Sequence, residues 1–131
     1  MKPRRLLIVE DDPFIRDACT EFFEDRGYAT VSVDDAARAL DEIARRPPDL
    51  IVLDLLMPRA RLDGVGFLFR AATGSAVDIP IIILSGLAEA VADQIPPHVA
   101  HALRIVAIVP KPIDFEALAR EVDRGFSTPA A

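Results

Sequence analysis

Acidic and basic side chains follow the ends of several apolar segments of this sequence. Glu10 and Asp11 come directly after one aliphatic run, Asp54 follows a second, and Lys111 stands just past a third. Carboxylates about 4 Å apart repel by about 4 kcal/mol at an effective dielectric constant near 20, so a pocket that gathers them requires a positive partner. A hard divalent cation with oxygen ligands is one such partner, and the Lys111 ammonium is another.

Asp54 in such a pocket could act as a nucleophile. A carboxylate that attacks a phosphoryl group forms an acyl phosphate, and a metal ion, a lysine and a hydroxyl donor stabilise the developing charge. Ser85 follows another apolar run and would supply the hydroxyl. The predicted chemistry is phosphoryl transfer to Asp54, with Mg²⁺ or Mn²⁺ as cofactor.

The elements that must position these residues can be predicted from periodicity. Five segments rich in β-branched and aliphatic residues are predicted strands: 5–9, 29–33, 50–53, 79–84 and 104–109. Four of them are nearly unbroken apolar runs, typical of strands covered on both faces. Stretches with helical periodicity alternate with the strands: 14–25, 36–43, 64–72, 87–95 and 113–126. This alternation predicts an α/β fold with a parallel sheet and helices on both faces, where ligands bind at the carboxyl ends of the strands.

Several residues have predicted structural roles. The first helix is expected to bury Phe14, Ala18, Phe22 and Phe23 on one face, with Cys19 packed in the core and Gly27 as its stop. Asp12, Asp35 and Asp114 are expected helix caps, and Met57 is expected to pack or to anchor a loop. His98 and His101 have no clear third ligand and are expected to face solvent.

Composition excludes several other classes of protein. A chain of 131 residues, 51% of them hydrophobic, fits one compact domain. The net charge of −6 disfavours nucleic acid and anionic membranes as partners, because both attract clustered Lys and Arg. Cys19 is the single cysteine, which rules out an internal disulfide and favours a reducing compartment. The apolar runs are too short for a signal peptide or a membrane span, so we expect a soluble, cytoplasmic protein.

Four motifs in order resemble the response regulator receiver domain of bacterial two-component signalling. The matching pieces are 7–12, 50–54 with Met57-Pro58 and Asp63-Gly64, 84–86, and Lys111-Pro112. The resemblance extends from about residue 6 to residue 125. It implies a flavodoxin-like (βα)5 fold with strand order 2-1-3-4-5.

The resemblance also assigns roles to individual residues. It makes Asp54 the phosphoacceptor, Ser85 the Ser/Thr switch residue, and Lys111 the conserved-type lysine before a cis proline at Pro112. Glu10 and Asp11 match the acidic pair, with Asp11 the more direct metal ligand. The backbone carbonyl of Leu56 would be a further metal ligand.

Three departures from the family pattern bear on the output of the domain. The loop after Asp54 is about two residues longer than usual and carries Arg59 and Arg61, which either attract a partner or are solvated loop charges. The stretch before Lys111 is about four residues longer, which predicts a short fourth helix and a rebuilt segment over 98–103. Ile108 stands where the family usually has Tyr or Phe, so readout through an inward-swinging ring is not expected.

The expected function is that of a phosphoacceptor in a two-component phosphorelay. A histidine kinase or phosphotransfer protein would phosphorylate Asp54, switching a surface that binds a downstream protein or a second copy. The domain is expected over residues 1–126 with a tail over 127–131, either as a complete single-domain protein or as part of a larger regulator or hybrid kinase. A receiver-fold binding module with weakened output coupling is the alternative. An aspartyl phosphatase of the haloacid dehalogenase type would need an acid at Leu56, so catalysis beyond the domain's own phosphorylation and dephosphorylation is not expected.

Overall fold

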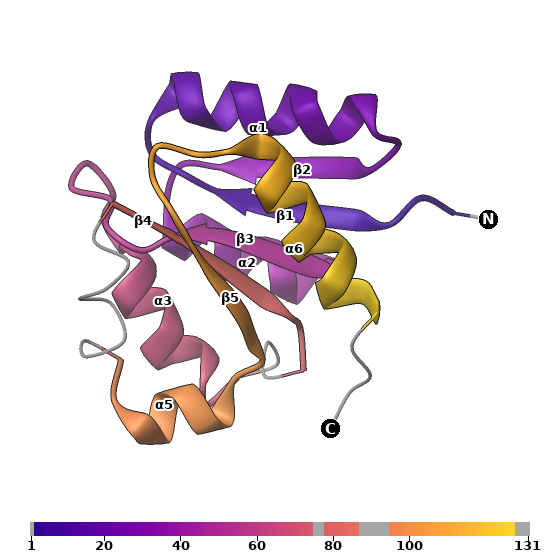
Figure 1. Cartoon of the computed structure of the whole chain (residues 1–131). Helices are drawn as coiled ribbons and strands as arrows, with labels where there is room; N and C mark the ends of the chain where they lie inside the picture. Colours follow the sequence, from indigo (N-terminus) through magenta and orange to yellow (C-terminus); the bar gives the residue numbers. More distant parts are fainter. Residues whose placement is uncertain (1, 75–77, 87–94, 128–131) are drawn as a thin grey trace.

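The strands of the protein form one parallel sheet, as seen in a computed structural model that describes residues 2–74, 78–86 and 95–127 (Figure 1). The strands are β1 (Arg5–Val9), β2 (Ala29–Val33), β3 (Leu50–Asp54), β4 (Ile81–Ser85) and β5 (Ile105–Pro110). Their spatial order is β2-β1-β3-β4-β5. The predicted parallel sheet and its strand order are therefore confirmed.

The register of the sheet brings the polar strand ends to one edge. Val9 lies between Val33 of β2 and Leu53 of β3, so Glu10 and Asp54, one residue further on, end neighbouring strands. On the other side of β3, Asp54 pairs with Leu84. When neighbouring parallel strands end at the same level, the side chains that follow them lie next to one another. Residues far apart in sequence therefore meet at this edge.

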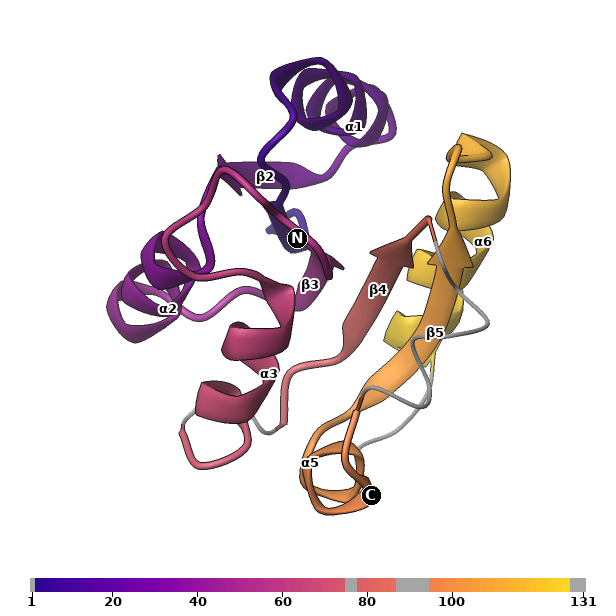
Figure 2. The same cartoon turned by 90° about the vertical axis from the view of Figure 1, so that its left-hand side faces the viewer.

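Helices cover both faces of the sheet (Figure 2). They are α1 (Pro13–Asp25), α2 (Ala36–Arg45), α3 (Gly64–Ala71), α5 (Pro97–Ala102) and α6 (Phe115–Ser127). One core lies between the sheet and α1 with α6, and the other lies between the sheet and α2, α3 and α5. No helix in the described ranges is long and apolar enough to cross a membrane.

Local signals in the sequence fix the helix ends. The Asp12 carboxylate caps α1 by accepting a hydrogen bond from the Phe14 backbone N–H at 2.9 Å, and Asp114 accepts one from Ala117 at 3.1 Å. Gly27, after α1, has a φ of 94°, a value that favours glycine. These caps and this stop were predicted.

The buried face of α1 differs in phase from the prediction. Phe14 is 84% exposed, whereas Cys19 and Phe23 are fully buried and Ile15 and Phe22 pack against them. The buried stripe runs i, i+4, i+7, i+8 from Ile15, and Ala18 is exposed like Phe14, so the prediction that these two residues join the core is wrong. Burial raises the pKa of the Cys19 thiol to about 12, which agrees with a packing role.

The second half of the fold contains strand β5 and the segment that precedes it. Strand β5 is covered on both faces, as predicted, because Val106 and Val109 pack in one core and Ile105 and Ile108 pack against the other. Of its six residues only Val109 is buried, since the strand lies at the edge of the sheet. The predicted fourth helix over 87–95 lies outside the described residues except for Ile95. The segment predicted to be rebuilt, 98–103, forms most of α5 and buries Val99 and Leu103 in the core shared with α2 and α3.

Candidate functional site

Three carboxylates from two strand ends converge at the carboxyl edge of the sheet. Glu10, Asp11 and Asp54 each place one oxygen so that all three lie within 4.8 Å of one another. Glu10 is fully buried and Asp54 is 3% exposed, while Asp11 is half-buried and faces solvent on one side. Among the residues that the structure describes, this is the only cluster of three or more His, Cys, Asp and Glu side chains with metal-binding spacing.

Lys111 provides the positive charge that these carboxylates require. Its Nζ donates to Glu10 Oε1 at 2.7 Å and lies 3.2 Å from Asp54 Oδ2. The lysine arrives from the end of β5, where its backbone N–H donates to the Ser85 carbonyl at 2.9 Å. The peptide bond that follows, to Pro112, is cis, as predicted. One ammonium therefore bridges two buried carboxyl groups. This role explains why one of the two lysines of the sequence stands at this position.

The electrostatics of the site favour a proton or a cation at Asp54. Burial, reinforced by the hydrogen bond and the charge of Glu10, raises the pKa of Asp54 to about 8, although Lys111 opposes this shift. Burial alone would lower the pKa of Lys111, but the hydrogen bond to Glu10 and the two carboxylate charges outweigh it, so its pKa is raised. At neutral pH Lys111 therefore stays charged, and Asp54 keeps a proton that a bound cation would displace.

The donor set fits a hard divalent cation. Glu10 Oε2 is buried and has no hydrogen-bond partner, so it has a lone pair to offer a metal ion, directly or through a water molecule. The available ligands are all carboxylate oxygens, which suit Mg²⁺ or Mn²⁺. Leu56 lies in the loop just past Asp54, with its side chain 46% exposed. The role of its carbonyl as a ligand stays a prediction.

Ser85 ends β4, the strand next to the one that ends in Asp54. It is 2% exposed and stands one residue beyond Leu84, the register partner of Asp54. The structure thus brings together the side chains of Glu10, Asp11, Asp54 and Lys111 and places Ser85 at the neighbouring strand end. The hydroxyl's part in the chemistry stays a prediction.

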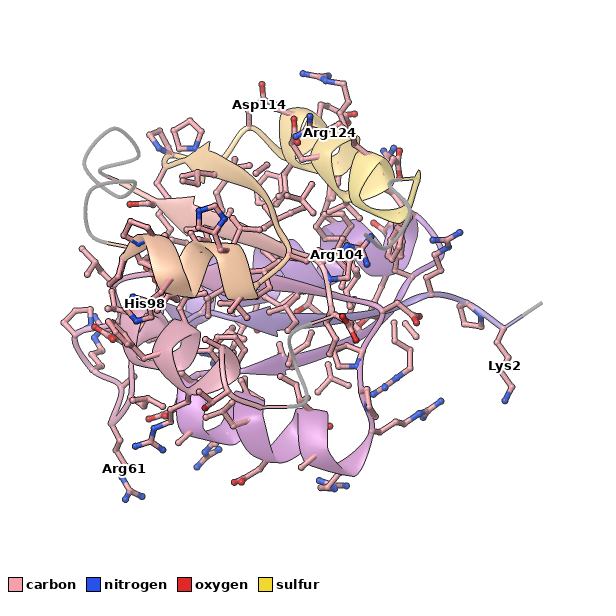
Figure 3. All side chains as sticks on the ribbon, turned by 90° about the horizontal axis from the view of Figure 1, so that it is seen from below. Lys2, Arg61, His98, Arg104, Asp114 and Arg124 are labelled. Atoms are coloured by element: carbon pink, nitrogen blue, oxygen red, sulfur yellow. The ribbon has the colours of Figure 1, made fainter. Side chains whose placement is uncertain are left out.

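The loop between β3 and α3 makes contacts at this edge that the sequence did not reveal. The backbone N–H of Arg59 donates to Asp11 Oδ2 at 3.2 Å, and that of Arg61 donates to Asp35 Oδ2 at 2.6 Å. Both arginine side chains are exposed, and that of Arg61 extends away from the body of the molecule (Figure 3). The predicted helix cap at Asp35 pointed to part of this arrangement, because a buried capping carboxylate has a second oxygen that also needs a hydrogen-bond donor.

Three further predictions concern residues outside the cluster. His98 and His101 are both exposed, as predicted. Ile108 is half-buried and packs against the core shared with α2 and α3. Met57 is 2% exposed, in agreement with its predicted packing role.

The sequence matches the family described as response regulator receiver domain over residues 6–123. The chain belongs to this family. Response regulator MprA of Mycobacterium tuberculosis is 38% identical over 81 residues, which are 62% of this chain and 34% of that protein. The nitrogen assimilation regulatory protein NtrX of Azorhizobium caulinodans is also 38% identical over 81 residues, 62% of this chain and 18% of that protein. This receiver domain therefore spans about a third or less of the curated relatives it matches.

Solved structures agree with the family assignment. The receiver domain of NtrX from Brucella abortus superposes with a TM-score of 0.81 at 26% identity, covering 95% of this chain and 99% of that one. A sensor protein from Polaromonas sp. JS666 superposes with a TM-score of 0.80 at 30% identity, covering 95% and 96% of the two chains. The chain is thus a receiver domain of two-component signalling, with the flavodoxin-like fold of its relatives.

Proposed function

We propose that this receiver domain accepts a phosphoryl group on Asp54 in a reaction that depends on Mg²⁺ or Mn²⁺. The observation that carries the proposal is the convergence of Glu10, Asp11 and Asp54 within 4.8 Å, with Lys111 bridging two of them. The donor would be the phosphohistidine of a histidine kinase or phosphotransfer protein. Membership of the receiver family supports this choice of donor.

Different residues of the site would have different roles in phosphoryl transfer. An oxygen of Asp54 bonds to phosphorus while the phosphorus–nitrogen bond of the donor breaks and the histidine nitrogen keeps the electron pair. Lys111, which lies 3.2 Å from Asp54, would donate to phosphoryl oxygens, and the Ser85 hydroxyl would do the same. Glu10, Asp11, Asp54 and the Leu56 carbonyl would hold the metal ion, which neutralises charge on the phosphoryl group.

An apolar pocket beside Lys111 offers a contact surface for the donor protein. Its volume is about 240 Å³, and the residues around it include the exposed Phe14 at the start of α1. The residues around it other than Lys111 are all apolar, with Phe14 84% exposed, and a contiguous apolar surface of this kind is typical of one that a protein partner covers. Phe14 therefore supports a protein, rather than a small metabolite, as the physiological donor.

In the cytoplasm, the phosphorylated domain would change its binding to a downstream protein. It would not catalyse the turnover of other substrates. Leu56 occupies the position where an aspartyl phosphatase of the dehalogenase type would need its general acid. Ile108 is aliphatic, so the change on phosphorylation would be transmitted by the packing of β5 and its neighbours and not by an aromatic ring.

Beryllofluoride, which forms a complex resembling acyl phosphate, tests the proposed site without a kinase. With Mg²⁺ present, we expect amide NMR shifts at Asp54, Ser85 and Lys111 in the wild type and none in Asp54→Asn. Shifts confined to residues away from the carboxyl edge of the sheet would contradict the proposal.

A further inference from the structure

Asp35 joins the start of α2 to the loop between β3 and α3. Its carboxylate is 7% exposed; Oδ1 accepts from the Ala37 N–H at 2.8 Å and Oδ2 from the Arg61 N–H at 2.6 Å. In return, the Ala36 N–H donates to the Leu62 carbonyl at 3.0 Å. One side chain therefore caps a helix and fixes a loop whose middle lies beside the phosphorylation site.

The charge on Asp35 makes these bonds strong. Burial would raise its pKa, but hydrogen bonds from the backbone N–H groups of Ala37, Arg61 and Leu62 outweigh burial and lower it. The carboxylate is ionised at neutral pH, and hydrogen bonds to an ionised acceptor are about twice as strong as neutral ones. The contact to Arg61 is thus a firm anchor.

The anchored loop reaches the metal-binding carboxylates two residues earlier. The Ala60 N–H donates to the Met57 carbonyl at 3.0 Å, closing a turn between the buried Met57 and Arg61. Within this turn, the Arg59 N–H donates to Asp11 Oδ2 at 3.2 Å. A turn held at both ends fixes the direction of this N–H, and therefore the rotation of the Asp11 carboxylate.

We propose that Asp35 is a positioning residue of the phosphorylation site: it holds the loop so that Arg59 turns Asp11 toward Glu10 and Asp54. This inference rests on the proposed function, since it concerns the same metal site. Mutation of the groups that orient metal ligands typically weakens metal binding by about 10- to 100-fold.

Two matched variants test the proposal: Asp35→Ser and Asp114→Ser. Both replace a capping aspartate with serine, which can still cap a helix, but serine at position 35 is too short to hold Arg61. Mg²⁺ titrations of the metal-free proteins, followed by amide NMR shifts, should show about tenfold weaker binding for Asp35→Ser and unchanged binding for Asp114→Ser. Hydrogen exchange at the Arg59 and Arg61 amides should also become faster only in Asp35→Ser.

The outcomes separate this inference from the proposed function. If the wild type binds Mg²⁺ and a folded Asp35→Ser binds it equally well, the positioning role is wrong and the proposed function stands. If affinity falls equally in Asp114→Ser, a general loss of stability is the cause and the inference is again wrong. A wild type that binds no Mg²⁺ overturns both. Should Asp35→Ser not fold, Asp35→Asn keeps one acceptor oxygen and must show the same weakening of Mg²⁺ binding.

Discussion

Replacing the charge of Asp54 should stabilise the metal-free protein, and increasingly so as the pH rises. The carboxyl group has a pKa of 3.8 when unperturbed and about 8 in the folded protein. The folded state therefore keeps a proton that the unfolded state releases between these values, so the free energy of unfolding falls as pH rises through this window. The asparagine of Asp54→Asn does not titrate, so the free energy of unfolding of this variant does not fall for this reason.

The magnitude follows from the pKa and from the distances. Each pH unit between the two pKa values changes stability by about 1.4 kcal/mol, which sets a ceiling of about 6 kcal/mol for the whole window. Two carboxylates 4.8 Å apart, the upper limit for this cluster, repel by about 3 kcal/mol at an effective dielectric constant near 20. Because Lys111 offsets part of this repulsion, we expect Asp54→Asn to gain about 3 kcal/mol near pH 9 and about 1 kcal/mol near pH 5.

Urea unfolding in EDTA at both pH values measures this difference. Asp17→Asn is the matched control, because Asp17 is an exposed aspartate on α1 that is not part of the cluster. Adding Mg²⁺ should stabilise the wild type, by about 1.4 kcal/mol at a concentration ten times the dissociation constant. An equal gain for Asp54→Asn at both pH values would refute the electrostatic account of the site.

Two other substitutions probe the support of the site. Lys111→Met removes the ammonium that pairs with the buried Glu10 carboxylate, so we expect the metal-free protein to lose about 3 kcal/mol at neutral pH in urea unfolding. Lys2→Met at the exposed terminus should lose nothing measurable. A loss shared by both lysine variants would contradict this account. Gly64→Ala should cost about 2 kcal/mol or more in thermal or urea unfolding, because the new Cβ would clash with the Asp54 carbonyl and lie 2.6 Å from Leu55 Cα. Gly74→Ala, whose Cβ would make only ordinary contacts, is the control, and equal stabilities would show that the backbone at Asp54 can yield.

Much of the fold and the site could be predicted because both depend on simple patterns. Apolar runs ending in polar residues placed Glu10, Asp54 and Ser85 at strand ends, and parallel strands share one carboxyl edge. Lys111 followed from the need for a positive charge beside buried carboxylates. Strand order, the cis bond at Pro112 and the individual roles came from the family resemblance and not from periodicity.

The remaining features depend on three-dimensional contacts that leave no pattern in the sequence. Phe14 is apolar and near the right helical phase, but it stands one residue before the stripe that faces the sheet. The two arginines of the long loop drew attention by charge, yet their backbone N–H groups make the contacts to Asp11 and Asp35. Any residue except proline could donate these bonds, so no side-chain pattern could reveal them.

Covalent phosphorylation of Asp54 is the central claim, and intact-protein mass measures it directly. The wild type and Asp54→Asn are incubated with Mg²⁺ and either acetyl phosphate or phosphoramidate, and the masses are compared before and after mild base, which hydrolyses acyl phosphates. We predict that the wild type gains one base-labile phosphoryl group only when Mg²⁺ is present and that Asp54→Asn gains none. A wild type that takes up no phosphoryl group from these donors or from a histidine kinase, or a variant that takes it up equally, would contradict the account.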